Sequence, residues 1–359
     1  MSRMALRPGA MVVAPALAAA VMAVAVPGVV HAEPKIRTKN VACEASALQK
    51  ALSTKGKVRL VLKKNCTYNL TERAYNKYSG TSTYFGLLAQ GDKTVIGNGA
   101  TLKWSGTQKA GVLVVRGNLH LENVTVTGGT YSGIAIGDLN GNKWTLEMTD
   151  VTVTGNTGSH TAGGGVWVAA GGKLQAHRSR IAGNTTQFGN GGGVAVNPGG
   201  SATLIDSQVE NNSATGDPQT TANFPQGGNG GGIYNRGTLT LKNSTVTNNT
   251  SRHSALNEPK PEPSGDFSLE TGHRPTSEEK EETYPDSGEG GGIYNAGTLT
   301  LDGRSRITGN TTAPFKTGGT TGKVGGLHNS GTVKSDGLAT IDSNVPANCG
   351  GPQPLSPCR

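Results

Sequence analysis

The sequence has 359 residues, of which 55 are glycine and 4% are aromatic, and its formal net charge is +9. It contains one long apolar run, from Ala10 to Val30, and no second run of this kind follows. This pattern argues against a protein with several membrane spans.

The first 32 residues have the order of a secretory signal. Arg3 and Arg7 precede the apolar run, and Val30-His31-Ala32 follows as a small-residue exit. This order predicts cleavage after Ala32 and a mature chain that is secreted or held at the cell surface. An uncleaved membrane anchor is the alternative because the run is long enough to span, but two prolines favour cleavage.

Four cysteines lie in local pairs near the two ends of the mature chain. The even number and the spacing predict the disulfides Cys43–Cys66 and Cys349–Cys358 and an oxidising compartment. Metal binding is the weaker interpretation because no Cys-x-x-Cys motif or histidine cluster accompanies them.

The first predicted elements form a cap. Residues 44–53 are expected to be an amphipathic helix, followed by strands at 58–62 and 66–70. Such a helix would cover the open end of a stack of strands, whose edge groups would otherwise pair with other chains. We therefore expect residues 33–93 to form an N-terminal cap and the first coil.

From about Thr94 the sequence repeats itself. Gly230–Leu241, Gly-Gly-Gly-Ile-Tyr-Asn-Arg-Gly-Thr-Leu-Thr-Leu, returns at Gly290–Leu301 with a single substitution. Weaker copies begin at Gly163, Gly191 and Gly325. Repeats of strand residues and glycine turns without helical periodicity predict a β-solenoid.

Two polar columns are predicted to run along the stack. One lies at the second turn of each coil, where asparagine can adopt the left-handed conformation, and each coil is expected to hold three strands. Its members are Asn123, Asp150, Arg178, Asp206, Asn243 and Arg304. The other, at the end of the first strand, consists of Asn197, Asn235, Asn295 and Asn329.

Three insertions, at residues 214–229, 251–289 and 313–323, follow the third strand and should leave along one edge. Residues 251–289 hold ten acidic and four basic side chains and are expected to be mobile. The basic excess elsewhere favours anionic envelope polymers over nucleic acid as partners, and it serves general solubility equally well. The run Glu278–Glu282 could hold calcium loosely, but such runs are usually solvated, so we expect no cofactor and no metal.

This pattern resembles right-handed parallel β-helix proteins. The resemblance is to the pectate-lyase-like architecture and, more closely, to the Gly-Gly-rich repeats of bacterial polymorphic outer-membrane proteins. It covers residues 94–344, although the Phe-x-x-Asn motif of those repeats is replaced here by Asn-Asn-Thr or Gly-Asn-Thr. It implies an all-β, single-stranded right-handed parallel β-helix, with residues 345–359 as a disulfide-closed tail.

A candidate binding strip lies on the first strand of the coils. Because Ile233 and Ile293 should point inward, Tyr234 and Tyr294 should point outward. Their expected equivalents are Trp167, Ala195 and His328, with Leu113 and Ala135 on earlier coils. In pectate-lyase-like families the substrate groove lies on this sheet, so the resemblance implies that Trp167, Tyr234, Tyr294 and His328 bind a glycan by stacking on sugars. The alternative is that the tyrosines only pack beneath the 251–289 insertion.

No catalytic residues can be assigned. The acidic calcium cluster, grouped aspartates or paired aspartates and glutamines that the resemblance would require are not found. The sequence therefore predicts a non-catalytic module that binds an anionic or neutral polysaccharide or another envelope component. A polysaccharide lyase or hydrolase with an unrecognised site is one alternative, and a structural spacer without a ligand is another.

Overall fold

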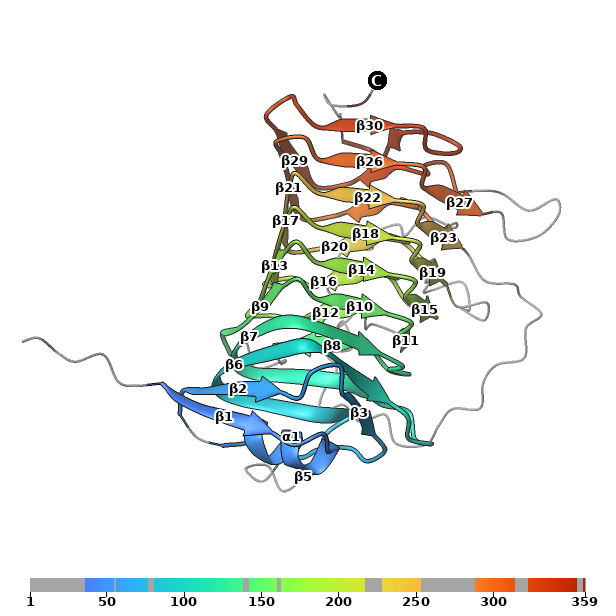
Figure 1. The fold of residues 1–359 in the computed structure, drawn as a ribbon. Coiled ribbons are helices and arrows are strands. Elements are labelled where there is room, and N and C mark those ends of the chain that lie inside the picture. Colours follow the sequence, from blue (N-terminus) through green and yellow to red (C-terminus); the bar gives the residue numbers. More distant parts are fainter. Residues whose placement is uncertain are drawn as a thin grey trace, which may run out of the picture. The chain divides into compact units, whose positions relative to one another are not determined.

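The protein is described by a computed structural model. The described residues are 36–54, 56–76, 81–137, 142–159, 163–216, 228–252, 288–313, 322–353 and 358. Residues Ile36–Arg359 form one compact unit, in which coils of strands stack one above another (Figure 1). The predicted all-β parallel β-helix is confirmed, while its right-handed sense and the domain boundaries at 93 and 344 stay predictions. The proposed signal lies outside the described residues.

Each full coil passes through four strands, and each strand pairs in parallel with its counterpart in the next coil. The first strands are β8 (Ile134–Ile136), β12 (Val166–Val168), β16 (Val194–Val196), β20 (Ile233–Asn235), β24 (Ile293–Asn295) and β28 (Leu327–Asn329). The second strands are β9 (Trp144–Thr149), β13 (Gly172–His177), β17 (Ser201–Ile205), β21 (Thr238–Lys242), β25 (Thr298–Asp302) and β29 (Thr332–Ser335). The third strands are β10 (Thr152–Thr154), β14 (Arg180–Ala182), β18 (Gln208–Glu210), β22 (Thr245–Thr247), β26 (Arg306–Thr308) and β30 (Thr340–Asp342). The fourth strands are β11 (Thr157–Ser159), β15 (Thr185–Gln187), β19 (Ser213–Thr215), β23 (Thr250–Arg252) and β27 (Thr311–Ala313).

The fourth strand corrects the expectation of three strands per coil. A second left-handed residue follows each third strand and turns the chain again, as at Gly183 (φ +62°) and Asn248 (φ +54°). The five short strands then form a separate parallel sheet. The insertions therefore leave after the fourth strand, and their central residues lie outside the described part of the chain.

The left-handed column at the second turn is confirmed for five of its six predicted members. Asn123, Asp150, Arg178, Asp206 and Asn243 have φ between +45° and +55°. In the sixth coil Gly303 (φ +63°) takes this conformation in place of Arg304, because the turn there is one residue longer. The Arg178 guanidinium donates two hydrogen bonds to Asp150, at 3.0 and 2.9 Å, and these lower the pKa of that carboxyl.

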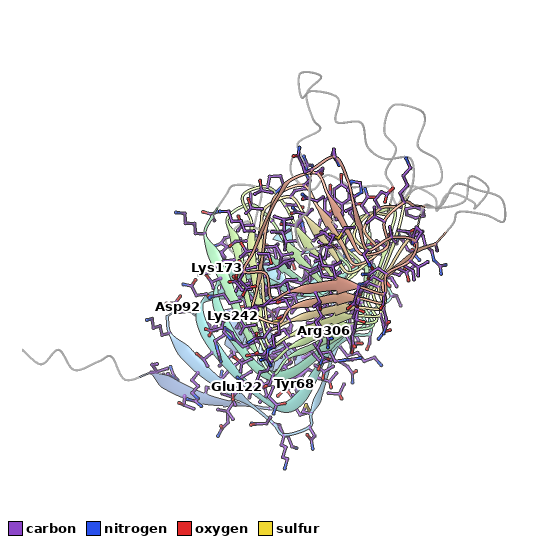
Figure 2. The ribbon with its side chains drawn as sticks, turned by 90° about the horizontal axis from the view of Figure 1, so that it is seen from above. Tyr68, Asp92, Glu122, Lys173, Lys242 and Arg306 are labelled. Carbon is purple, nitrogen blue, oxygen red and sulfur yellow. A yellow bond between two sulfur atoms is a disulfide. The ribbon has the colours of Figure 1, made fainter. Side chains whose placement is uncertain are left out.

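The interior of the coils combines apolar columns with a buried amide ladder. The apolar columns come from inward residues such as Leu239 and Val246, both 0% exposed. The ladder consists of Asn156, Asn184, Asn212, Asn249, Asn310 and Asn344. From Asn184 onward, each side-chain oxygen accepts the backbone N–H of the asparagine one coil earlier, at 2.9–3.1 Å, whereas the Asn156 oxygen accepts the Gly129 N–H at 2.9 Å. Outward positions carry the charged side chains, among them Lys173, Lys242 and Arg306 (Figure 2).

The second asparagine column is shorter than predicted. Asn235 donates to Asn295 at 2.7 Å, and Asn295 donates to Asn329 at the same distance. Asn197 does not join them, because Val196 pairs with Asn235 and Asn197 falls one residue later.

The N-terminal coils begin with the predicted cap. Helix α1 (Ala45–Leu52) buries Leu48, Ala51 and Leu52 and packs against β1 (Arg37–Val41), β3 (Thr67–Leu70) and the long strand β6 (Phe85–Trp104). Strand β2 (Val58–Leu62) pairs with β1 and β6. Strand β7 (Gly111–Thr127) pairs along β6, and β4 (Tyr75–Asn76) pairs with β5 (Thr81–Ser82). At the other end β31 (Cys349–Gly350) pairs with β28. Within the described residues, no helix has the length and apolar character needed to cross a bilayer.

Both predicted disulfides, Cys43–Cys66 and Cys349–Cys358, are present. The first joins Cys43, two residues before α1, to Cys66, directly before β3, so it holds the cap on the first coil. We expect the Cys43→Ser/Cys66→Ser variant to lose about 3 kcal/mol of unfolding free energy, because the unfolded chain gains the freedom of a 23-residue loop. Denaturant titration would measure this loss, and hydrogen exchange should show α1 opening first. A loss under about 1 kcal/mol with unchanged exchange in α1 would contradict this role.

Candidate functional site

The predicted strip forms one column on the outer face of the first strands. Trp167 pairs with Ala135 on one side and Ala195 on the other. Ala195 pairs with Tyr234, Tyr234 with Tyr294, and Tyr294 with His328. Leu113 does not belong to it, because Val114 pairs with Ala135 while Leu113 pairs with Ile134 and lies in the core. The glycine triplet that marks the register of later coils does not precede the strand that contains Leu113. The predicted equivalence of Leu113 with Ala135 was therefore wrong by one residue.

Trp167, Tyr234 and Tyr294 are buried, and the rings of Tyr234, Tyr294 and His328 stack on one another. Trp167, Tyr234 and Tyr294 are each 8% exposed. The Tyr234 and Tyr294 centroids lie 5.3 Å apart with planes at 21°, and those of Tyr294 and His328 lie 5.0 Å apart at 6°. Both faces of Tyr294 are therefore in contact with neighbouring rings. The expectation that these faces stack on sugar rings does not fit this geometry, and contact with a ligand would have to use the ring edges.

The glycine triplet helps to bury the strip. Gly230 has φ +66°, and a Cβ at this position would lie 2.3 Å from the Ile233 oxygen and 2.8 Å from the Tyr234 nitrogen. The turn before the first strand therefore folds tightly over the outward residue of its own coil. A side chain at this position would collide with the strand and adopt an unfavourable φ, which explains the repeated glycine.

At its N-terminal end the strip merges with a second apolar cluster outside the coil interior. Its members are Ala74, Phe85, Leu88, Val114, Tyr131, Ala135, Trp167, Ala169 and Ala195. Burial here raises the pKa of Tyr131 to about 12, with a smaller contribution from Tyr84. The column from Ala135 to Ala195 is therefore packed against apolar side chains on the side of the cap.

At its C-terminal end the strip meets a buried carboxylate, Glu289. Glu289 is 3% exposed and accepts hydrogen bonds from the backbone N–H groups of Lys323 and Val324, each at 3.0 Å. Its Oε2 lies 3.6 Å from Nδ1 of His328, whose side chain is 13% exposed. Glu289 was not among the predicted site residues, because the sequence showed it only as one of the acidic residues of the 251–289 insertion. Its position directly before a glycine triplet, where Asn229 stands one coil earlier, was the available signal.

Two buried nitrogens of the strip lack a hydrogen-bond partner within the described part of the chain. They are Nε1 of Trp167 and Nδ1 of His328. The 3.6 Å separation from Glu289 is too long for a hydrogen bond. Buried polar atoms are nearly always hydrogen-bonded, so these two atoms need a partner that the described residues do not supply.

The described residues contain no group of three or more histidine, cysteine or carboxylate side chains that could hold a metal ion. The acidic run Glu278–Glu282, considered for calcium in the sequence analysis, lies outside them.

The sheet topology defines the class of this chain as a parallel β-helix protein. No protein-family model and no curated protein matches the sequence. Among solved structures, it is similar to an alginate lyase from Paenibacillus sp. str. FPU-7, with a TM-score of 0.37 and 14% sequence identity over 88% of this chain and 97% of that one. A similarity this distant supports no inference about activity or substrate.

Proposed function

We propose that the mature protein is an exported, non-catalytic β-helix module that binds a glycan or another envelope component along the strip of Trp167, Tyr234, Tyr294 and His328. The observation that carries this proposal is the pair of buried nitrogens, on Trp167 and His328, without a partner. The signal-like N-terminus and the two disulfides support the extracellular setting.

The ligand contact in this proposal is polar. Neighbouring rings cover both faces of Tyr294, and the unpaired nitrogens lie on Trp167 and His328, so the indole N–H and the imidazole edge are the groups that meet hydroxyl or carboxylate oxygens. The two residues are four coil steps apart, about 19 Å at the usual spacing between paired strands. An extended polymer can reach both positions, whereas a single sugar cannot.

A polysaccharide lyase is the second candidate, and the Glu289–His328 pair favours it. Two backbone N–H groups hold the carboxylate beside an imidazole that stacks on Tyr294. Histidine is the most common general base, and a carboxylate close to it favours the protonated imidazole that forms after proton abstraction. In this case product formation, and not only binding, would depend on His328.

Affinity electrophoresis in gels that contain acidic or neutral polysaccharides tests the proposal. We expect retardation of the mature chain, and about fivefold weaker binding for Trp167→Phe and for His328→Phe, which keep a ring but lose the nitrogen. Thr240→Ala, on the outer face of β21, is the control and should bind normally. Unsaturated or reducing ends that disappear in His328→Phe would establish the lyase instead. If neither retardation nor products are observed, the proposal is wrong and the hypothesis of a structural spacer without a ligand is favoured.

A further inference from the structure

We propose a second ligand site, a groove at the capped end of the β-helix that binds a neutral sugar. The groove has a volume of about 900 Å³ and lies between α1 and the segment that leads from β3 to β4. Small-molecule sites usually have volumes of about 300–1,000 Å³. It is formed by the cap and involves no residue of the strip, so it goes beyond the function proposed above.

Both walls of the groove are fixed by hydrogen bonds. On the helix side, the Gln49 amide oxygen accepts the Leu88 backbone N–H at 2.9 Å, and its nitrogen donates to Ser53 Oγ at 2.7 Å. On the other side, Arg73 donates through Nη2 to the Lys109 carbonyl, and its guanidinium lies 5.0 Å from the centre of the Tyr84 ring. Walls that are already ordered lose little entropy when a ligand binds.

Arg73 also has an unused donor. Its Nε is buried and has no hydrogen-bond partner within the described residues. Because the other contacts hold the guanidinium in place, this N–H is a fixed donor on a residue that lines the groove. A buried N–H of a charged group is costly to leave unpaired, so a ligand oxygen would stabilise it.

The charges of the lining indicate the class of ligand. Lys50 and Arg73 carry hydrogen-bond donors, whereas Glu44 and Glu72 carry acceptors, and the four charges balance. A balanced site gives no net attraction to an anionic polymer. It suits neighbouring sugar hydroxyls, each of which both donates and accepts.

An exposed aromatic ring completes the site. Tyr75 lines the groove and is 55% exposed, one of few large hydrophobic side chains in the described chain that face solvent. Amphipathic rings of this kind stack on the C–H face of a sugar while the hydroxyl stays in water. Unlike the rings of the strip, the Tyr75 ring is open to an approaching ligand.

Isothermal titration of the mature chain with neutral gluco-, galacto- and manno-oligosaccharides and with acidic uronate oligosaccharides tests the site. We expect a neutral oligosaccharide to bind, and Tyr75→Ala or Arg73→Gln to weaken that binding about tenfold. Leu338→Ala, which removes a side chain that is 63% exposed near the C-terminal end, is the matched control and should bind normally.

The variants separate this site from the strip, because binding that Tyr75→Ala weakens belongs to the groove and binding that His328→Phe weakens belongs to the strip. The proposal is overturned if no neutral oligosaccharide binds, if only uronate oligosaccharides bind, or if Tyr75→Ala and Leu338→Ala weaken binding equally.

Discussion

Replacing Asn249 with alanine is expected to lower the free energy of unfolding by about 4 kcal/mol. The Asn249 side-chain oxygen accepts two hydrogen bonds from Asn212, one from its backbone N–H at 2.9 Å and one from its amide at 3.0 Å. Its nitrogen donates to the Val209 carbonyl and to Asn310, both at 2.9 Å. All of these groups are buried, so the substitution leaves several polar atoms without partners.

Denaturant titration of the mature chain measures this effect. Asn118→Ala is the matched control, because its amide is exposed and makes one hydrogen bond, to Asp92. That substitution should change stability by less than about 0.5 kcal/mol. Similar losses for the two variants would show that the buried ladder contributes no more than surface hydrogen bonds.

The second large effect is expected for Gly231→Ala, with a loss of about 3 kcal/mol. A Cβ at Gly231 would lie 2.3 Å from the Thr250 carbonyl carbon and 2.5 Å from the Gly291 oxygen. These are backbone atoms, one at the start of β23 and the other in the turn before β24, so no side chain can move aside to make room. The chain has to shift at the point where successive coils contact each other.

Gly337→Ala is the control for this substitution. Gly337 has φ +81°, and nothing lies within 4 Å of a Cβ placed there. This substitution should cost about 1 kcal/mol, from the left-handed conformation alone. Thermal unfolding should therefore separate the two variants clearly. If Gly231→Ala unfolds at the same temperature as Gly337→Ala, the close contact between the coils is not restrictive.

The fold was predictable because its signals are local and periodic. The glycine triplets gave the register of β20 and β24, and the amphipathic pattern of residues 44–53 gave the capping helix. The one-residue slips at Leu113, Asn197 and Arg304 have a common cause. Residue types alone do not reveal where a turn gains or loses a residue when either register gives a plausible alignment.

The candidate site was less predictable, because it depends on contacts between coils. The outward direction of Tyr234 follows from alternation, but its burial depends on the rings stacked beside it. In the sequence, Glu289 is one of ten acidic residues of the insertion, and only the stacking of the coils shows that it lies beside His328. The groove at the cap has no sequence signature, because a helix and a distant segment form its two walls.

The amide ladder also bears on how this protein can change length over generations. Its last rung does not point to a further coil, since Asn344 donates through its backbone and its amide to Asn348 only four residues later, at 2.9 and 3.2 Å. The hydrogen bonds from Asn344 to Asn348 thus end the amide ladder, next to the Cys349–Cys358 loop. Duplication of a repeat in the middle would keep both ends intact, whereas an asparagine in an appended unit would not find the Asn344 donors free, because they already bind the Asn348 side-chain oxygen. The fold can therefore accept an additional coil between its two ends more readily than one added after Asn348.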